Sequence, residues 1–150
     1  MEVVAASAED ADAVAAIFIA ARRVAMPWLP ELRNVGGVPR YFADHVIGEG
    51  EVLVVRRADA PVAFLALRGD MIEHLYVRPD AQRNGIGTAL VAAAKARRPA
   101  GLGLWVFQRN HAARALYARR GFAEVELTDG ADNEEREPDV RLAWTPRPPS

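Results

Sequence analysis

A glycine-containing turn is the part of the sequence whose residue types most clearly suit chemistry. Residues 77–88 join an apolar, strand-like segment to a helical one, and Gly85 and Gly87 lie where the helical pattern starts. Glycine lets the backbone approach a ligand closely, and the first amides of a helix have no partner within the helix. Because the helix dipole adds partial positive charge, such a turn can bind an anion such as a pyrophosphate. Arg78 and Arg83 add charge at its rim.

Two common phosphate-binding turns do not match this stretch. No Gly-Lys-Ser/Thr follows the glycines, so the turn is not a P-loop, and the third glycine of a dinucleotide-binding fingerprint is missing. A Gly-x-Gly also occurs in ordinary strand-to-helix turns. The two glycines alone therefore leave an ordinary turn open.

Two longer segments resemble the GCN5-related N-acetyltransferase (GNAT) family. Residues 73–87 read EHLYVRPDAQRNGIG, in which Gln82, Gly85 and Gly87 match the family's acyl-CoA motif, Gln/Arg-x-x-Gly-x-Gly/Ala. A second match to the family consists of Asn110, Ala113, Leu116, Tyr117, Gly121 and Phe122. The order of the expected elements also agrees with the family from residue 3 to residue 144.

The resemblance implies that the chain binds acetyl-CoA as a co-substrate. In the family the strand of the motif, here residues 71–77, splays from the next strand, here residues 102–107, and the pantetheine arm fills the gap. A bulge usually turns an amide near Tyr76 toward the thioester carbonyl, where it would stabilise the oxyanion. The cofactor-binding residues implied by the resemblance are Leu75, Tyr76, Val77, Gln82, Arg83, Asn84, Gly85, Ile86, Gly87, Thr88, Asn110, Ala113 and Tyr117.

Transfer of an acetyl group to an amine needs a neutral amine, a polarised carbonyl and a stabilised thiolate. Tyr117 lies seven residues after Asn110, about two helical turns, so the two share a face that by resemblance meets the sulfur. Its phenol, with a reference pKa of about 10, can hydrogen-bond a thiolate, whose reference pKa is about 8.5. Glu73 is the first candidate for the base and His74 the second, on opposite faces of the strand unless a bulge intervenes. Each of the three also has a purely structural interpretation, as a core tyrosine, a surface carboxylate and a partly buried spacer.

The acceptor side of the site is less distinct in the sequence. By resemblance the first two helices and the last hairpin wall it, and the candidate substrate-binding residues are Trp28, Arg33, Glu134 and Glu135. Aromatic groups with carboxylates suit a cationic amine, whereas Arg33 could hold a substrate carboxylate. The expected function is transfer of the acetyl group to a primary amine of a small molecule, by direct attack in a ternary complex. Alternatives are a protein or peptide acceptor, a non-catalytic acyl-CoA-binding sensor, and an interaction module with the acidic hairpin as its interface.

Hydrophobic periodicity and turn residues predict the elements that position these groups. The predicted strands span residues 3–6, 51–57, 61–68, 71–77, 102–107, 122–127 and 140–144, and the predicted helices span residues 8–24, 39–47, 87–98 and 110–120. Antiparallel hairpins on both sides of one strand-helix-strand crossover predict an α/β (α+β) fold. We therefore expect the GNAT fold, with a mixed, mostly antiparallel sheet of six to seven strands and about four helices. Residues 1–145 form one expected domain, and residues 146–150 an expected disordered tail.

Composition excludes several classes of function. The 150 residues contain no cysteine and carry a net charge of −1, so disulfides and thiolate catalysis are excluded and bulk attraction to nucleic acid or membrane is not expected. The three histidines lack metal-ligand spacing, so no metal is expected. The first residues lack the pattern of a signal peptide, which favours the cytoplasm. Dimers are common in the family, and the resemblance leaves a homodimer open.

Overall fold

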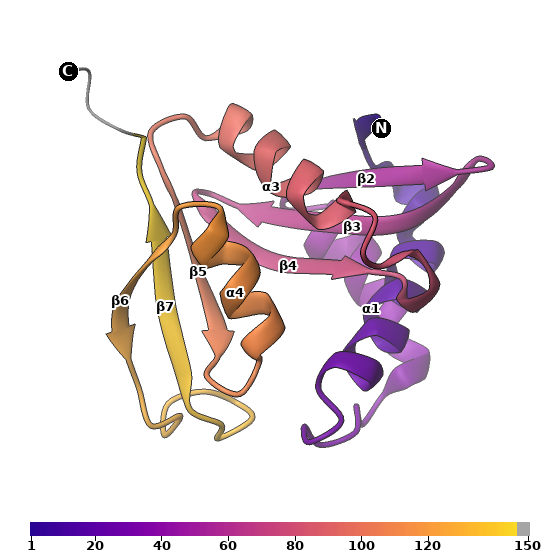
Figure 1. The fold of residues 1–150 in the computed structure, drawn as a ribbon. Helices are drawn as coiled ribbons and strands as arrows, with labels where there is room; N and C mark the ends of the chain where they lie inside the picture. Colours follow the sequence, from indigo (N-terminus) through magenta and orange to yellow (C-terminus); the bar gives the residue numbers. More distant parts are fainter. Residues whose placement is uncertain (147–150) are drawn as a thin grey trace.

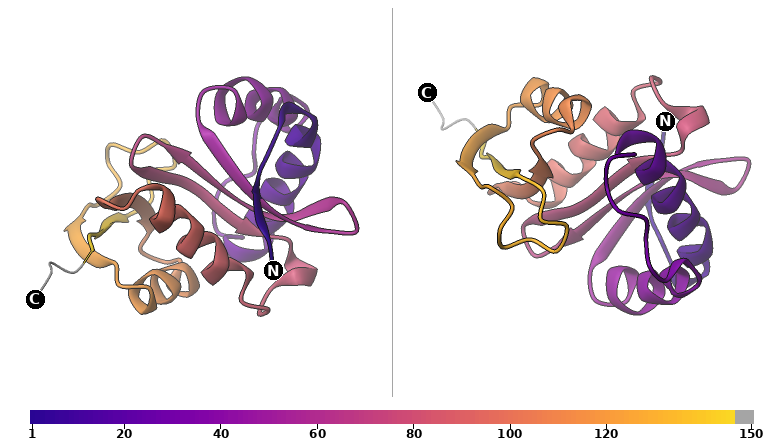
Figure 2. Two further views of the ribbon diagram at one scale, coloured as in Figure 1. Left: turned by 90° about the horizontal axis from the view of Figure 1, so that it is seen from above. Right: turned by 90° about the horizontal axis from the view of Figure 1, so that it is seen from below.

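The computed structural model, which describes residues 1–146, contains a seven-stranded mixed sheet with helices on both faces (Figures 1 and 2). The strands follow the order β1-β2-β3-β4-β5-β7-β6, and only β4 and β5 are parallel neighbours. The strands are β1 (Val3–Ala5), β2 (Glu51–Arg57), β3 (Ala60–Arg68), β4 (Met71–Val77), β5 (Leu102–Phe107), β6 (Ala123–Leu127) and β7 (Asp139–Trp144). The helices are α1 (Ala11–Ala25), α2 (Val38–Tyr41), α3 (Ile86–Arg97) and α4 (His111–Arg119). The predicted fold class is confirmed.

The sheet divides the hydrophobic core into two layers. On one face α3 and α4 pack Leu90, Val91 and Tyr117 against the inner residues of the strands. On the other face α1 and the segment after α2 pack Val14 and Phe42 onto β2 and β3. Figure 2 shows the two groups of helices on opposite sides of the strands. The candidate site described below lies between these two layers, where two neighbouring strands of the sheet separate.

The start of α1 is held by a local turn and by one long-range ion pair. The Ser7 backbone amide donates to the Asp10 carboxylate at 2.9 Å, across the 3-10 turn Ala8–Asp10 that precedes the helix. Arg56 of β2 donates twice to the same carboxylate, each time at 2.8 Å. The hydrogen bonds from Arg56 hold the pKa of the buried Asp10 carboxyl below its usual range. This pair therefore fastens the helix that borders the site to the sheet.

The helices differ in detail from their predicted ranges. The helix predicted at residues 8–24 begins with a 3-10 turn over Ala8–Asp10, and α4 is one residue shorter at each end than predicted. The helix predicted at residues 39–47 begins as α2 and continues as a π-helix over Phe42–Ile47. Helix α3 begins one residue early, at Ile86, because Gly85 adopts a left-handed conformation (φ 75°) at its N-cap. The part of the chain that the structure describes contains no helix long and apolar enough to cross a membrane. The tail predicted at residues 146–150 falls, from residue 147 on, outside the described residues.

Candidate active site

The two parallel strands in the middle of the sheet separate soon after they meet. Strands β4 and β5 pair only at Met71 with Gly103 and at Ile72 with Leu104, and beyond these pairs they diverge (Figure 1). The gap contains a cavity of about 280 Å³, which we call the reaction cavity. Its walls are formed by Phe18, Arg22, Met26, Ile72, Glu73, His74, Leu75, Tyr76, Leu104, Trp105, Val106, Phe107, Asn110, Ala113, Tyr117 and Glu135. The splay expected for these two strands is therefore present.

A bulge in β4 decides which backbone groups face this gap. Strand β3 pairs Ala66 with His74 but Leu67 with Ile72, so Glu73 is the extra residue. After the bulge, the Arg78 amide donates to the Val62 carbonyl of β3 at 2.7 Å. Alternation in an antiparallel pair then turns the backbone groups at positions 74 and 76 toward β3 as well, and those at positions 75 and 77 toward the gap. The bulge thus lies three residues before Tyr76, and Tyr76 itself reaches the cavity with its side chain.

The glycine turn leaves a row of backbone donors without partners. No amide from Gln82 to Thr88 donates to another residue in the described range 1–146, and Ala89 is the first to donate, to the Gly85 carbonyl at 3.0 Å. The Gln82 side chain donates instead to the Val77 carbonyl at 3.3 Å, and Asn84 donates to the Ala81 carbonyl at 3.3 Å. These side chains fasten the turn while its amides stay available. The arrangement fits the expected pyrophosphate cradle.

Helix α4 places a tyrosine on the opposite wall of the reaction cavity. Asn110 accepts a hydrogen bond from the Ala113 amide at 3.2 Å and so caps the helix, while Tyr117, two turns later, is 5% exposed. The Tyr117 ring packs against Phe122 at 5.2 Å between centroids. Burial, with the nearby Tyr76, raises the pKa of Tyr117 above its usual value. The phenol therefore stays protonated and can donate a hydrogen bond; the predicted role of Tyr117 toward the sulfur stays a prediction.

His74 and Glu73, the two predicted bases, lie in contrasting surroundings. His74 packs among the rings of Phe18, Phe42, Phe64 and Tyr76, with centroid separations of 5.4, 5.5, 6.2 and 6.2 Å. Burial lowers the pKa of His74 to about 4, because an imidazolium there would lose its hydration. His74 is thus a neutral aromatic spacer at ordinary pH and a weak proton acceptor.

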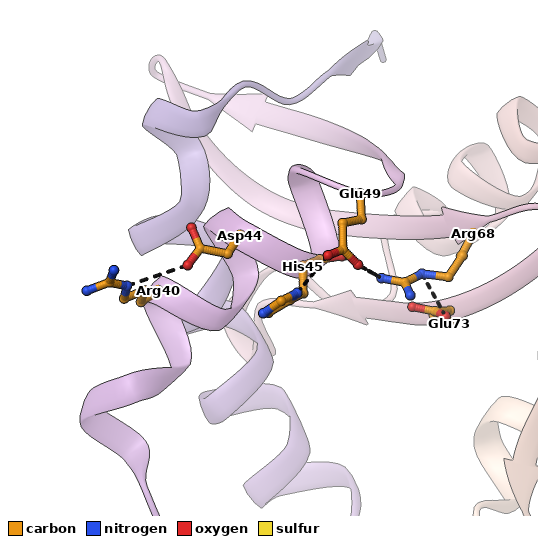
Figure 3. Close-up of polar contacts among 6 residues, drawn as sticks. All are labelled: Arg40, Asp44, His45, Glu49, Arg68 and Glu73. Carbon is orange, nitrogen blue, oxygen red and sulfur yellow. Dashed lines mark hydrogen bonds and ion pairs between the residues drawn. The ribbon is translucent and has the colours of Figure 1, made fainter.

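The Glu73 carboxylate also borders the reaction cavity, but it belongs to a chain of surface ion pairs (Figure 3). Arg68 places its Nε 3.4 Å from Glu73 and donates through Nη2 to Glu49 at 3.0 Å and to the His45 carbonyl at 2.7 Å. His45 Nδ1 lies 2.9 Å from the other oxygen of Glu49. Arg68 thus pairs the Glu73 carboxylate with a network of partly exposed side chains. The role of Glu73 as a base stays a prediction.

A second, larger cavity adjoins the first and contains most of the predicted acceptor residues. It measures about 690 Å³, and Arg33, Glu134 and Glu135 all lie on its walls; we call it the acceptor cavity. The two cavities share Phe18, Arg22, His74 and Glu135.

Trp28 is the predicted acceptor residue that the structure places elsewhere. Its ring meets Phe107 edge-on at 5.8 Å, and the Arg109 guanidinium lies 4.5 Å from its centroid. It belongs to the walls of neither the reaction cavity nor the acceptor cavity. Trp28 therefore packs between its neighbours instead of lining the acceptor site.

One site residue was missed by the sequence analysis. Arg22 of α1 lies four residues after Phe18 and four before Met26, which caps the helix, and all three border the reaction cavity. An arginine in the middle of an otherwise apolar stripe was the signal that could have revealed it. Tyr76, which the sequence analysis predicted as a cofactor-binding residue, also borders this cavity.

Sequence and structure comparisons place this site in a known family. The family described as "Acetyltransferase (GNAT) domain" matches residues 48–124. A mycothiol acetyltransferase from Parafrankia sp. (strain EAN1pec) is 43% identical over 81 residues, which are 51% of this chain and 25% of that protein. The chain thus matches about a quarter of the length of this curated relative.

Solved structures share the fold over nearly the whole chain. A GCN5-related N-acetyltransferase from Rhodopseudomonas palustris has a TM-score of 0.79 at 24% identity, covering 96% of this chain and 94% of that one. The apo form of YjaB from Escherichia coli has a TM-score of 0.77 at 23% identity, covering 95% and 96%. The PaiA N-acetyltransferase from Thermoplasma acidophilum, in complex with coenzyme A, has a TM-score of 0.71 at 14% identity, covering 97% and 99%. With a splayed β4–β5 pair, a cradle of unpaired amides and a domain match over half its length, the chain belongs to the GNAT acetyltransferase family.

Proposed function

We propose that this protein transfers the acetyl group of acetyl-CoA to a primary amine of a small molecule, by direct attack in a ternary complex. The observation that carries the proposal is the reaction cavity, which has free strand amides on one wall and the buried Tyr117 on the other and opens into the acceptor cavity. Family membership supports acetyl transfer, and the name of the curated relative supports a small-molecule acceptor.

The backbone of β4 and of the glycine turn would hold the cofactor. The amides at positions 75 and 77 face the gap and can pair with the amide groups of a pantetheine arm, as an added strand would. The amides of residues 82–88 can bind the pyrophosphate, with Arg83 at the exposed rim of the turn. An extended arm in the gap would bring its thioester to the level of Tyr117.

Tyr117 would assist the leaving group. When the amine attacks the thioester carbonyl, negative charge moves first to oxygen and then to sulfur. A phenol that is protonated and largely shielded from water can donate a hydrogen bond to that sulfur, and such a bond is stronger in a water-poor cavity than in solution. The acceptor cavity would admit the amine to one face of the thioester carbonyl, and the thiolate would then depart from the tetrahedral intermediate toward Tyr117.

Thiol release from acetyl-CoA tests the proposal. Parent protein is incubated with acetyl-CoA and one amine at a time, drawn from polyamines, amino acids, aminoglycosides, arylalkylamines and peptides, and the free thiol is titrated. We expect release with at least one class of small amine, matched by an equal amount of acetylated amine in the mass spectrum.

The melting temperature separates the alternatives. Acetyl-CoA should raise it, because a ligand that binds only the folded state stabilises that state. A shift without release for any amine would favour the acyl-CoA sensor, and release with peptides alone would favour a peptide acceptor. Absence of both shift and release at millimolar acetyl-CoA would refute the proposal.

A further inference from the structure

An acceptor amine arrives at neutral pH mostly as an ammonium ion, since alkyl amines titrate near the lysine value of about 10.4. Attack on a thioester needs the neutral form, so a residue beside the reacting centre must accept a proton. The residue that meets this need should border the reaction cavity and also the path by which the amine enters.

Three cavities converge on one carboxylate. A third cavity, of about 530 Å³, lies on the face of β5 away from α4, and its walls include the exposed Trp105 together with Glu126, Asp132 and Asp139. Of the residues that the structure describes, Glu135 alone belongs to the walls of the reaction cavity, the acceptor cavity and this third cavity. Glu135 therefore lies where each of the two outer cavities borders the reaction cavity.

The loop that carries Glu135 is held on both sides of it. Asn133 donates to the Glu137 carbonyl at 2.6 Å and to the Asp139 carboxylate at 3.2 Å. Arg109 donates twice to the Glu137 carboxylate, at 2.7 and 3.0 Å. Glu135, between these anchors, is partly buried and forms no ion pair within residues 1–146. Its carboxylate is therefore presented by an ordered loop and is available to a ligand.

Glu135 also lies close to the reacting end of the reaction cavity. Burial raises the pKa of Tyr76 to about 12, and the charges of Arg22 and Glu135 shift it further in opposite directions, so both groups lie near the Tyr76 phenol. Tyr76 in turn acts on the pKa of Tyr117, the proposed partner of the sulfur. Tyr76 thus lies near both the Glu135 carboxylate and Tyr117, on whose side of the cavity the thiolate would leave.

Other charged and titratable groups share cavity walls with Glu135. Arg22 and Arg33 face it from the side of α1, with Glu31 and Tyr41, and Glu73, His74 and Tyr76 face it from β4. The remaining groups are Tyr117 from α4, Glu134 beside it, and the three carboxylates of the third cavity. Among the acids, Glu73 is paired with Arg68, and the others do not border the reaction cavity.

We propose that Glu135 is a catalytic residue that binds the ammonium group of the acceptor and takes its proton. The proposal rests on the proposed acetyl transfer. The proton passes from nitrogen to the Glu135 carboxylate, the neutral amine forms the C–N bond, and the C–S bond breaks. The thiolate leaves hydrogen-bonded to Tyr117, and the excess proton that remains on nitrogen ends on sulfur. The products are the acetylated amine, free CoA thiol and a protonated Glu135, which returns its proton to water through the outer cavities.

The pH dependence of Glu135→Gln tests this role, with Glu126→Gln as the matched control. Both changes remove one carboxylate, but Glu126 borders only the third cavity. We expect Glu135→Gln to lower the turnover number about a hundredfold and to erase the acidic limb of the rate profile. The rise in melting temperature with acetyl-CoA should be unchanged, which shows that the variant is folded. Glu126→Gln should keep the limb.

An acceptor that is already neutral separates catalysis from positioning. With a weakly basic amine such as an arylamine or a hydrazide, no proton has to be removed before attack, so the defect of Glu135→Gln should shrink at least tenfold. If Glu135 had only a structural role, Glu135→Gln would lower the turnover number equally with both kinds of amine. The inference is overturned if the acidic limb of the rate profile persists in Glu135→Gln or if Glu73→Gln erases it instead. It is also overturned if the loss of turnover in Glu135→Gln does not depend on the basicity of the amine. A parent protein that binds acetyl-CoA but acetylates no amine would instead overturn the proposed function, and this inference with it.

Discussion

The burial of His74 predicts that acid destabilises the fold by a defined amount. The neutral imidazole is enclosed by four aromatic rings, and its pKa is about 4 in the folded protein against about 6.5 in an unfolded chain. Below pH 6.5 the His74 imidazole therefore binds a proton in the unfolded chain but stays neutral in the folded protein. Stability from this residue is complete above pH 6.5 and is lost as the pH falls toward 4.

The size of the effect follows from these two values. Between pH 8 and pH 5 the unfolded state gains about 2 kcal/mol relative to the folded state through His74, from the linkage relation with 1.36 kcal/mol per pKa unit. In His74→Phe a ring of similar size occupies the same aromatic cluster and cannot titrate. The free energy of unfolding of the parent should therefore fall by about 2 kcal/mol more than that of His74→Phe over this range.

Urea unfolding at pH 8 and pH 5 measures the difference directly. The exposed His111 supplies the control, because His111→Asn removes a histidine from the surface and not from the aromatic cluster, and should keep the parent's dependence on pH. Equal losses for the parent and His74→Phe would refute the reasoning, since the ring would then be hydrated in the folded protein. That result would also restore His74 as a candidate base.

Three further changes probe other parts of the structure. Tyr117→Phe keeps the ring packing and removes the hydroxyl, so we expect the turnover number to fall about a hundredfold. The rise in melting temperature with acetyl-CoA should be unchanged. If the turnover number is unchanged while the chemical step is rate-limiting, Tyr117 is a core residue only. Gly87→Glu should abolish the rise in melting temperature with acetyl-CoA, because the new carboxylate would repel the phosphates. The protein should stay folded, because a Cβ at this position meets only Leu116 Cδ2, at 3.4 Å. An undiminished rise would show that the pyrophosphate binds elsewhere. Asp10→Asn weakens the charged hydrogen bonds to Arg56 and should cost about 1 to 3 kcal/mol in urea unfolding, whereas no loss would show that the pair only balances its desolvation.

Local features of the chain were predictable from the sequence, because short-range physics decides them. A glycine at position 85 accepts the left-handed conformation that the start of α3 requires, and Asn110 offers an oxygen to the first amides of α4. Strand and helix periods placed nearly every element within one or two residues. The motif segments also predicted the row of free amides in the glycine turn and the separation of β4 from β5, which depend on the same local order of elements.

Contacts between distant segments decided the rest. The bulge at Glu73 exists only in the register of β4 against β3, and it sets which amides face the gap. The low pKa of His74 depends on rings contributed by α1, the π-helix, β3 and β4.

The convergence of cavities on Glu135 is the clearest case. Its surroundings bring together α1, β4 and the loop before β7, which are separated by dozens of residues in the chain. In the sequence Glu135 is one member of an acidic run and looks no different from Glu134. By itself the sequence predicted the family, from its motif residues, and the order of the elements, which follows from local conformational preference. Only the tertiary structure showed that Glu135 borders all three cavities, because that depends on how the loop before β7 packs against distant elements.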